Sequence, residues 1–244
     1  MKKQLFLGLL ILFSVGVFAH TNQTSKGMNK YRSQWEQVEK FEKDNLPKSA
    51  LSVVNRIFKD AVFFDLEHYI YKKPICIGVF GCCFYDYKNE KLKVTQYMIE
   101  NKTDALEILK LARDYFDNAY RVKNKKYIVT FSGNNDFTVI NYLFEKYEIN
   151  FDIKEHFIHI DIQREYEKAK GSNIGLKALE KEFNIERESE LISGQNLAKT
   201  FGKMMKDKDY INRMPEEKKD KILLYNEQDV VSLFYMCLDW GKVI

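Results

Sequence analysis

The chain has 244 residues, of which 45% are hydrophobic and 30% are charged, and these proportions exclude a disordered or low-complexity protein. Its length allows one substantial domain with additional elements. The first 60 residues carry 10 basic and 5 acidic side chains, whereas the remaining residues carry 29 and 30. The main part of the chain therefore has no overall basic surface, and any binding to nucleic acid must use a local basic patch or metal ions.

Residues 1–19 have the pattern of a secretory signal peptide. Met1-Lys2-Lys3 precedes the apolar run LFLGLLILFSVGVFA, and small residues lie near Ala19. The run is shorter than the about 20 residues that span a membrane, so cleavage after Ala19 is favoured over an uncleaved anchor. We therefore expect no stable membrane partner unless this segment is retained.

Residues 20–60 are predicted to form a helical extension with two short helices. Apolar residues recur there at helical spacing, at Tyr31, Trp35, Val38 and Phe41. Together with the leader, the segment YRSQWEQVEKFEKDNLPKSALSVVNRIF resembles the start of exported bacterial alpha-2-macroglobulin-like proteins. This resemblance covers about the first 60 residues, and it implies an export leader joined to an unrelated domain.

From residue 61 the pattern changes to that of an α/β domain. Strands are expected over residues 61–66, 74–86, 91–99, 126–131 and 156–162, and the second and third form a hairpin. Helices are expected over residues 103–121, 136–147, 174–184, 194–206 and 216–240. The order of three strands, a helix, a strand, a helix, a strand and further helices predicts a mixed sheet flanked by helices.

The four cysteines point to a compartment different from the one the leader suggests. Cys76, Cys82 and Cys83 lie in one apolar run, Cys237 lies near the end, and their spacing fits no common metal motif. Buried reduced thiols are typical of intracellular proteins. Two localisations therefore stay open, cytoplasmic from the cysteines and exported from the leader.

Two carboxylates mark the expected end of the first strand. The apolar residues 61–64 are followed by Asp65-Leu66-Glu67, and residues two apart on a strand face the same side. Asp65 and Glu67 would repel each other there. Alone the pair is a weak signal, because most such pairs are solvated surface acids. At the end of a strand that enters the core, a divalent cation between the two carboxylates would explain the arrangement.

Two further acids and a tyrosine complete the candidate set. Asp136 follows strand 126–131 in the segment SGNNDF, where an ordinary first-turn aspartate is the commoner outcome. In YNEQDVVSL, Tyr225 and Asp229 are four apart and share a helix face. The apolar residues that follow Asp229 place it near the edge of the core.

Taken together, D-x-E on the first strand, a central aspartate and Y-x-x-x-D on a late helix resemble the DEDDy exonucleases of the ribonuclease H-like fold. The pattern is most similar to the YprB-type ribonuclease H-like domain, with further similarity in HIDI and NIGLKALEKEFNIER, over residues 61–240. It departs from the family at SGNNDF, where N-G-x-x-F-D is usual. It also departs at His68, where a small residue or threonine is common.

The resemblance implies a ribonuclease H-like α/β domain over residues 61–244, acting as a 3′–5′ exonuclease on single-stranded DNA or RNA ends. It implies two Mg²⁺ or Mn²⁺ ions, with Asp65 bridging both, Glu67 and Asp229 completing the first site and Asp136 holding the second. Tyr225 would orient the attacking water. The alternative is a non-catalytic nucleic-acid-binding or interaction module with a vestigial site, which the altered central motif and the neutral main part favour.

Two other features are left open by the sequence. Asp161 in HIDI is either an acid that supports the metal site or a structural residue. One face of a predicted helix carries three lysines that could contact phosphates, although a solvated face is the commoner outcome. These lysines are Lys199, Lys203 and Lys206.

Overall fold

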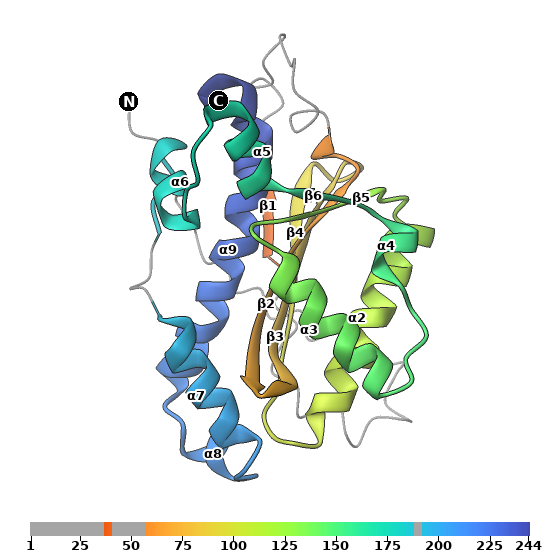
Figure 1. Ribbon diagram of the computed structural model, residues 1–244, viewed down its shortest axis with the longest axis vertical. Helices are drawn as coiled ribbons and strands as arrows, with labels where there is room; N and C mark the ends of the chain where they lie inside the picture. Colours follow the sequence, from red (N-terminus) through yellow and green to blue (C-terminus); the bar gives the residue numbers. More distant parts are fainter. Residues whose placement is uncertain (1–36, 41–56, 188–191) are drawn as a thin grey trace.

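The computed structural model describes residues 37–40, 57–187 and 192–244 (Figure 1). Six strands form one sheet in the order β1-β4-β3-β2-β5-β6. Strand β2 pairs antiparallel with β3 and parallel with β5, so the sheet is mixed, as predicted. The strands are β1 Gln37–Lys40, β2 Ala61–Tyr71, β3 Lys73–Asp86, β4 Lys91–Met98, β5 Tyr127–Thr130 and β6 Ile158–Asp161.

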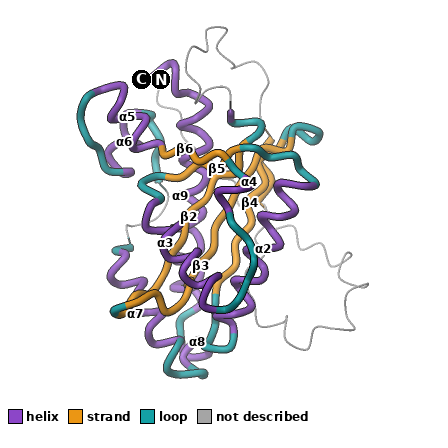
Figure 2. Tube along the Cα trace, turned by 45° about the vertical axis from the view of Figure 1, so that its right-hand side comes forward, coloured by secondary structure: helices purple, strands orange, loops and turns teal. Residues whose placement is uncertain are grey.

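Helices cover both faces of this sheet (Figure 2). The long helices α2, α3 and α9 agree with the predicted ones within a few residues, whereas α4, α5 and α8 were not expected. The helices are α2 Asp104–Arg121, α3 Asn134–Lys146, α4 Ile153–His156, α5 Ile162–Lys170, α6 Leu176–Glu182, α7 Gly194–Met204, α8 Tyr210–Arg213 and α9 Glu216–Val243.

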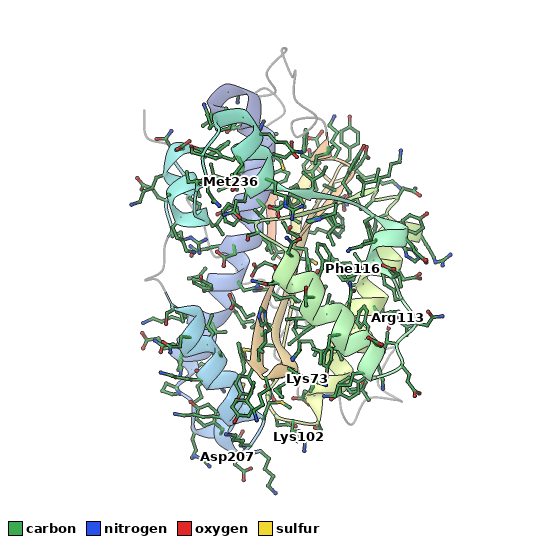
Figure 3. The ribbon with its side chains drawn as sticks, in the orientation of Figure 1. Lys73, Lys102, Arg113, Phe116, Asp207 and Met236 are labelled. Carbon is green, nitrogen blue, oxygen red and sulfur yellow. The ribbon has the colours of Figure 1, made fainter. Side chains whose placement is uncertain are left out.

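Alternation along β2 divides the core between the two faces. Phe64 packs against Phe116 of α2, with ring centroids 5.3 Å apart, and its neighbour Phe63 packs against Phe234 of α9 at 5.6 Å. Phe116 and Met236 belong to the two separate hydrophobic clusters and lie on opposite sides of the sheet (Figure 3). Odd-numbered residues of this part of β2 therefore face α9.

The first strand of the domain is longer than predicted. Strand β2 continues past Glu67 to Tyr71, and its pairing with β3 shifts register between Glu67 and His68. The parallel pairing with β5, in contrast, ends at Phe63. The change from apolar to acidic residues thus marks the point where one neighbouring strand ends, and Asp65 and Glu67 lie inside β2.

Residues 37–40 correct part of the expected helical extension. They form β1, which pairs antiparallel with β4, with Gln37 opposite Val94. Hydrogen bonding to the edge of the sheet outweighs the local helical spacing here. The remainder of the predicted leader and extension, residues 1–36 and 41–56, lies outside the described residues.

All four cysteines are buried and free, as predicted. The Cys83 thiol donates a hydrogen bond to the carbonyl of Val230 in α9, at 3.3 Å. Among the described residues, no helix combines the length and the apolar character needed to cross a bilayer.

Candidate metal centre

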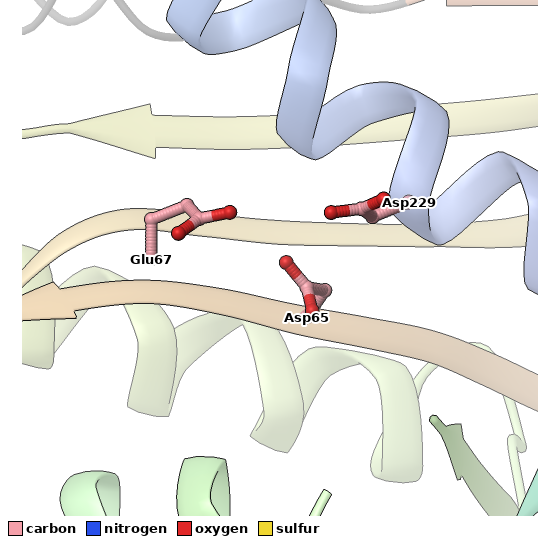
Figure 4. Close-up of side chains that lie close together, drawn as sticks. All are labelled: Asp65, Glu67 and Asp229. Carbon is pink, nitrogen blue, oxygen red and sulfur yellow. The ribbon is translucent and has the colours of Figure 1, made fainter. Parts of the chain in front are cut away.

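Three acidic side chains meet between β2 and α9 (Figure 4). One carboxylate oxygen from each of Asp65, Glu67 and Asp229 lies within 4.8 Å of the other two. Asp229 is buried, whereas Asp65 and Glu67 are half-buried, so the group remains open to solvent. Because hard divalent cations take oxygen ligands, these residues could hold a divalent cation.

Local structure brings these three residues together. Asp65 and Glu67 are two apart in β2, on the side of the strand that faces α9, as Phe63 does. Leu66, between them, packs into the cluster on the other face. The 28-residue helix α9 runs along the first side and presents Asp229 to the strand. The prediction that Asp65 and Glu67 share a face is confirmed.

The acids cannot all be ionised at neutral pH without added positive charge. Burial and the Asp229 carboxylate raise the pKa of Asp65 to about 7, partly offset by a hydrogen bond from Asn226. Burial together with Asp65, Asp229 and Asp136 raises the pKa of Glu67 to about 10. A cation among these oxygens would relieve both effects.

Asp136 lies close to this group but is not part of the tight set of three. It occupies the first turn of α3, where burial and the charges of Asp65 and Asp229 raise its pKa well above the usual value. Its Oδ1 atom is 3.9 Å from Nδ1 of His68. Burial lowers the pKa of His68, so a neutral imidazole stands beside the Asp136 carboxyl at neutral pH.

Tyr225 lies one helical turn before Asp229 and is half-buried. Burial and the charges of Asp229 and Glu67 raise the pKa of its hydroxyl above the usual value. The phenol therefore stays protonated at neutral pH and can donate a hydrogen bond near the acids.

A family model described as the RNase H superfamily matches residues 62–240, which is more than half of the chain. The chain belongs to the RNase H superfamily. No curated protein matches it. The predicted ribonuclease H-like domain is thereby confirmed, and an RNase H-like domain with an acidic, metal-sized cluster is consistent with a nuclease.

Sequence reasoning missed a buried amide pair in this RNase H-like domain. The Nδ2 atom of Asn226 donates to Oδ2 of Asp65 at 2.9 Å, and Nε2 of Gln96 donates to Oδ1 of Asn226 at 2.8 Å. Gln96 and Asn226 are both fully buried. The pair fixes the position of the Asp65 carboxylate. The available signal was Gln96, which occupies an inward-facing position of β4 between Val94 and Met98.

The approach of Asn226 to the sheet requires a glycine in β3. A Cβ atom at Gly81 would lie 2.0 Å from Oδ1 of Asn226. A glycine inside a strand often marks such a close approach, so this position also offered a signal in the sequence.

Two cationic residues that sequence reasoning did not assign contact Asp229. Oδ1 of Asp229 accepts hydrogen bonds from Nζ of Lys177, at 3.1 Å, and from Nη2 of Arg187. Arg187 is also held by the buried carboxylate of Glu180, through Nε at 2.8 Å. Both cations lie over the Tyr225 ring, with Lys177 Nζ 4.5 Å and Arg187 Cζ 5.5 Å from its centroid.

Asp161 has a structural role in this domain. Its Oδ1 atom accepts the backbone N–H of Ser132 at 2.9 Å and that of Gln163 at 3.1 Å. The first bond holds the turn at Ser132, whose φ is +53°, and the second caps α5. Asp161 therefore supports the turn that precedes Asp136.

Proposed function

We propose that this chain is a metal-dependent 3′–5′ exonuclease of the DEDDy type, which removes nucleotides from single-stranded ends of DNA or RNA. The observation that carries this proposal is the convergence of Asp65, Glu67 and Asp229 within 4.8 Å in an RNase H superfamily domain. Burial and neighbouring carboxylates raise the pKa values of Asp65 and Glu67. Such a costly arrangement is typical of functional sites.

Each residue has a distinct part in the proposed reaction. Asp65, Glu67 and Asp229 would hold one divalent ion, and Asp136 would help to hold a second. When bound, the ions would neutralise the acids and stabilise charge on the phosphodiester and the attacking water. The protonated hydroxyl of Tyr225 would orient that water by a hydrogen bond.

A second candidate is a nucleic-acid-binding module with a vestigial site. Its support is the pair of contacts that Lys177 and Arg187 make with Asp229, because these cations supply positive charge without a metal. The position of Asp136 outside the set of three acids also supports a vestigial site. In this case the domain would bind nucleic acid and leave it intact.

Degradation of end-labelled oligonucleotides distinguishes the two candidates. With Mn²⁺ or Mg²⁺, we expect 5′-labelled single-stranded DNA or RNA to be shortened progressively, and a chelator to stop the reaction. Asp65→Asn, which removes one negative charge with little change of shape, should lower the rate by at least the order of 10²-fold expected for a lost catalytic interaction.

The matched control is Asp114→Asn, the same chemical change at an exposed position on α2, which should leave the rate unchanged. Activity that persists in Asp65→Asn would identify a contaminating nuclease. Absence of degradation with either metal would favour the binding module.

A further inference from the structure

A groove of about 510 Å³ lies between α7 and the first turns of α9, and we call it the α7–α9 groove. Four lysines and one glutamate are the charged residues among those that line it, which gives the groove a net charge of +3. They are Lys199 and Lys203 from α7 and Glu217, Lys218 and Lys221 from α9. This is the local basic patch that a chain without an overall basic surface would need. Lys206, predicted to share the lysine face, follows the end of α7 and is not part of the lining.

Among the residues that the structure describes, acidic side chains balance only part of this positive charge. Glu217 forms an ion pair with Lys221, with Nζ and Oε1 2.8 Å apart. In the part of the chain that the structure describes, Lys199, Lys203 and Lys218 form no ion pair with an acidic side chain. All three are exposed, so their ammonium groups can reach an anion in the groove.

One face of α9 carries residues of both the groove and the metal centre. Lys218, Ile222, Tyr225 and Asp229 follow one another at spacings of four, three and four residues, so they lie on one face of the helix. At a rise of 1.5 Å per residue, Lys218 is roughly 17 Å along the axis from Asp229.

The other wall of the groove also leads to the acids. Helix α7 packs against β2, where a Cβ atom at Gly202 would lie 3.2 Å from the ring of Tyr69. Tyr69 is two residues beyond Glu67 in the same strand. Of the two helices that form the groove, α7 therefore packs on β2, which carries Asp65 and Glu67, and α9 itself carries Asp229.

We infer that the α7–α9 groove binds the phosphate backbone of the single strand whose end lies at the acids. This inference rests on the proposed function for the identity of the ligand. Lysines contact successive phosphates as point charges and release counterions, so they favour binding without selecting a sequence.

The test replaces the three unpaired lysines of the groove together, as Lys199→Gln/Lys203→Gln/Lys218→Gln. Binding is measured by fluorescence anisotropy with thymidine and uridine oligomers of about 12 nucleotides, a length within the site sizes of single-strand binders. The full-length chain carries Asp65→Asn in both samples, so hydrolysis does not interfere. We expect binding weaker on the order of tenfold, with a slope of log K against log salt smaller by about 2, for three phosphate contacts at about 0.7 each.

The matched control removes the same charge from exposed lysines elsewhere, as Lys88→Gln/Lys102→Gln/Lys123→Gln. It should change neither the affinity nor the salt slope. The inference is overturned if the groove variant binds like its parent, or if the control loses as much affinity as the groove variant.

Hydrolysis provides a second readout that separates this inference from the proposed function. In the active chain, the groove variant should raise KM for the oligomer on the order of tenfold and leave hydrolysis of the p-nitrophenyl ester of thymidine 5′-monophosphate unchanged, because that ester is too short to reach the groove. If the groove variant binds the oligomer more weakly but the unaltered chain does not hydrolyse it, phosphate binding by the groove is supported and the proposed exonuclease activity is overturned. Hydrolysis by both with equal KM would overturn the groove alone.

Discussion

Replacing Asp65 by asparagine should stabilise the metal-free protein at neutral and alkaline pH. Asp65 and Glu67 are half-buried next to buried Asp229, and ionisation of Asp65 is opposed by burial and by that neighbour. The asparagine amide can still accept the hydrogen bond that Asn226 now donates to Asp65. The substitution therefore removes a repulsive charge while keeping the main contact of the side chain.

The size and the sign of the effect follow from the pKa of Asp65. It rises from the ordinary value of 3.8 to about 7 in the folded protein, and a difference of this size corresponds to about 4 kcal/mol. The pKa of Asp65 is higher in the folded state than in the unfolded state. Its contribution to the free energy of unfolding is therefore fully present below about pH 4 and is lost as the pH rises to about 7. At pH 8 in chelator, wild type should be less stable than Asp65→Asn by up to about 4 kcal/mol, roughly 8–16 °C in Tm for a chain of this size.

The assay is thermal or urea unfolding from pH 4.5 to 8, in chelator and in Mn²⁺. In chelator the two stability curves should meet at the acidic end and diverge as the pH rises. In Mn²⁺ at 100 times its Kd, wild type should gain about 2.7 kcal/mol, and Asp65→Asn should lose most of that gain. Asp114→Asn on the exposed face of α2 is the control. Parallel curves for wild type and Asp65→Asn in chelator would refute the electrostatic argument.

Two other substitutions test the site from different sides. Tyr225→Phe should keep the stabilisation by Mn²⁺ but lower turnover on the order of 10²-fold, whereas Asp229→Ala should lose both; full activity in Tyr225→Phe would remove the hydroxyl from the mechanism. Gly81→Ala should cost about 1–3 kcal/mol by overpacking and weaken the response to Mn²⁺, because its Cβ would lie 2.0 Å from the Asn226 amide. Gly175→Ala, with no heavy atom within 4 Å of its Cβ, is the control in urea unfolding, and an equal loss in both variants would contradict this explanation.

Periodicity in the sequence was sufficient to predict a mixed sheet flanked by helices and part of the site. Apolar runs and helical spacing in a sequence reflect which residues are buried. In this domain the buried residues form two clusters, one on each face of a single sheet. Asp65 and Glu67 share a face because strands have a period of two. Tyr225 and Asp229 share a face because helices bring residues four apart together.

Hydrogen bonding between strands could not be predicted in the same way. Polarity along a strand indicates which residues are exposed, but it does not show where each neighbouring strand ends. The acids of β2 were therefore taken for the end of the strand, although only the pairing with β5 ends there. Strand β1 was missed for a related reason, since its partner β4 begins more than 50 positions further along the chain.

The contacts that hold the acids were beyond the reach of spacing arguments. Gln96 and Asn226 are 130 positions apart, and Arg187 and Asp229 are 42 apart. The residues next to a lysine or a glutamine in the sequence do not show which distant residue it will contact in the fold. Only its burial, as with Gln96 in the middle of β4, could have signalled a partner.

The cations at Asp229 are compatible with a metal because they use one oxygen of its carboxylate. Lys177 and Arg187 both donate to Oδ1, and Oδ2 accepts no hydrogen bond from the residues that the structure describes. The carboxylate of Glu180 binds the same guanidinium, so it balances part of the positive charge that Arg187 presents to Asp229. Asp229 would therefore keep one carboxylate oxygen available to a divalent ion, and the two cationic side chains would orient its carboxylate.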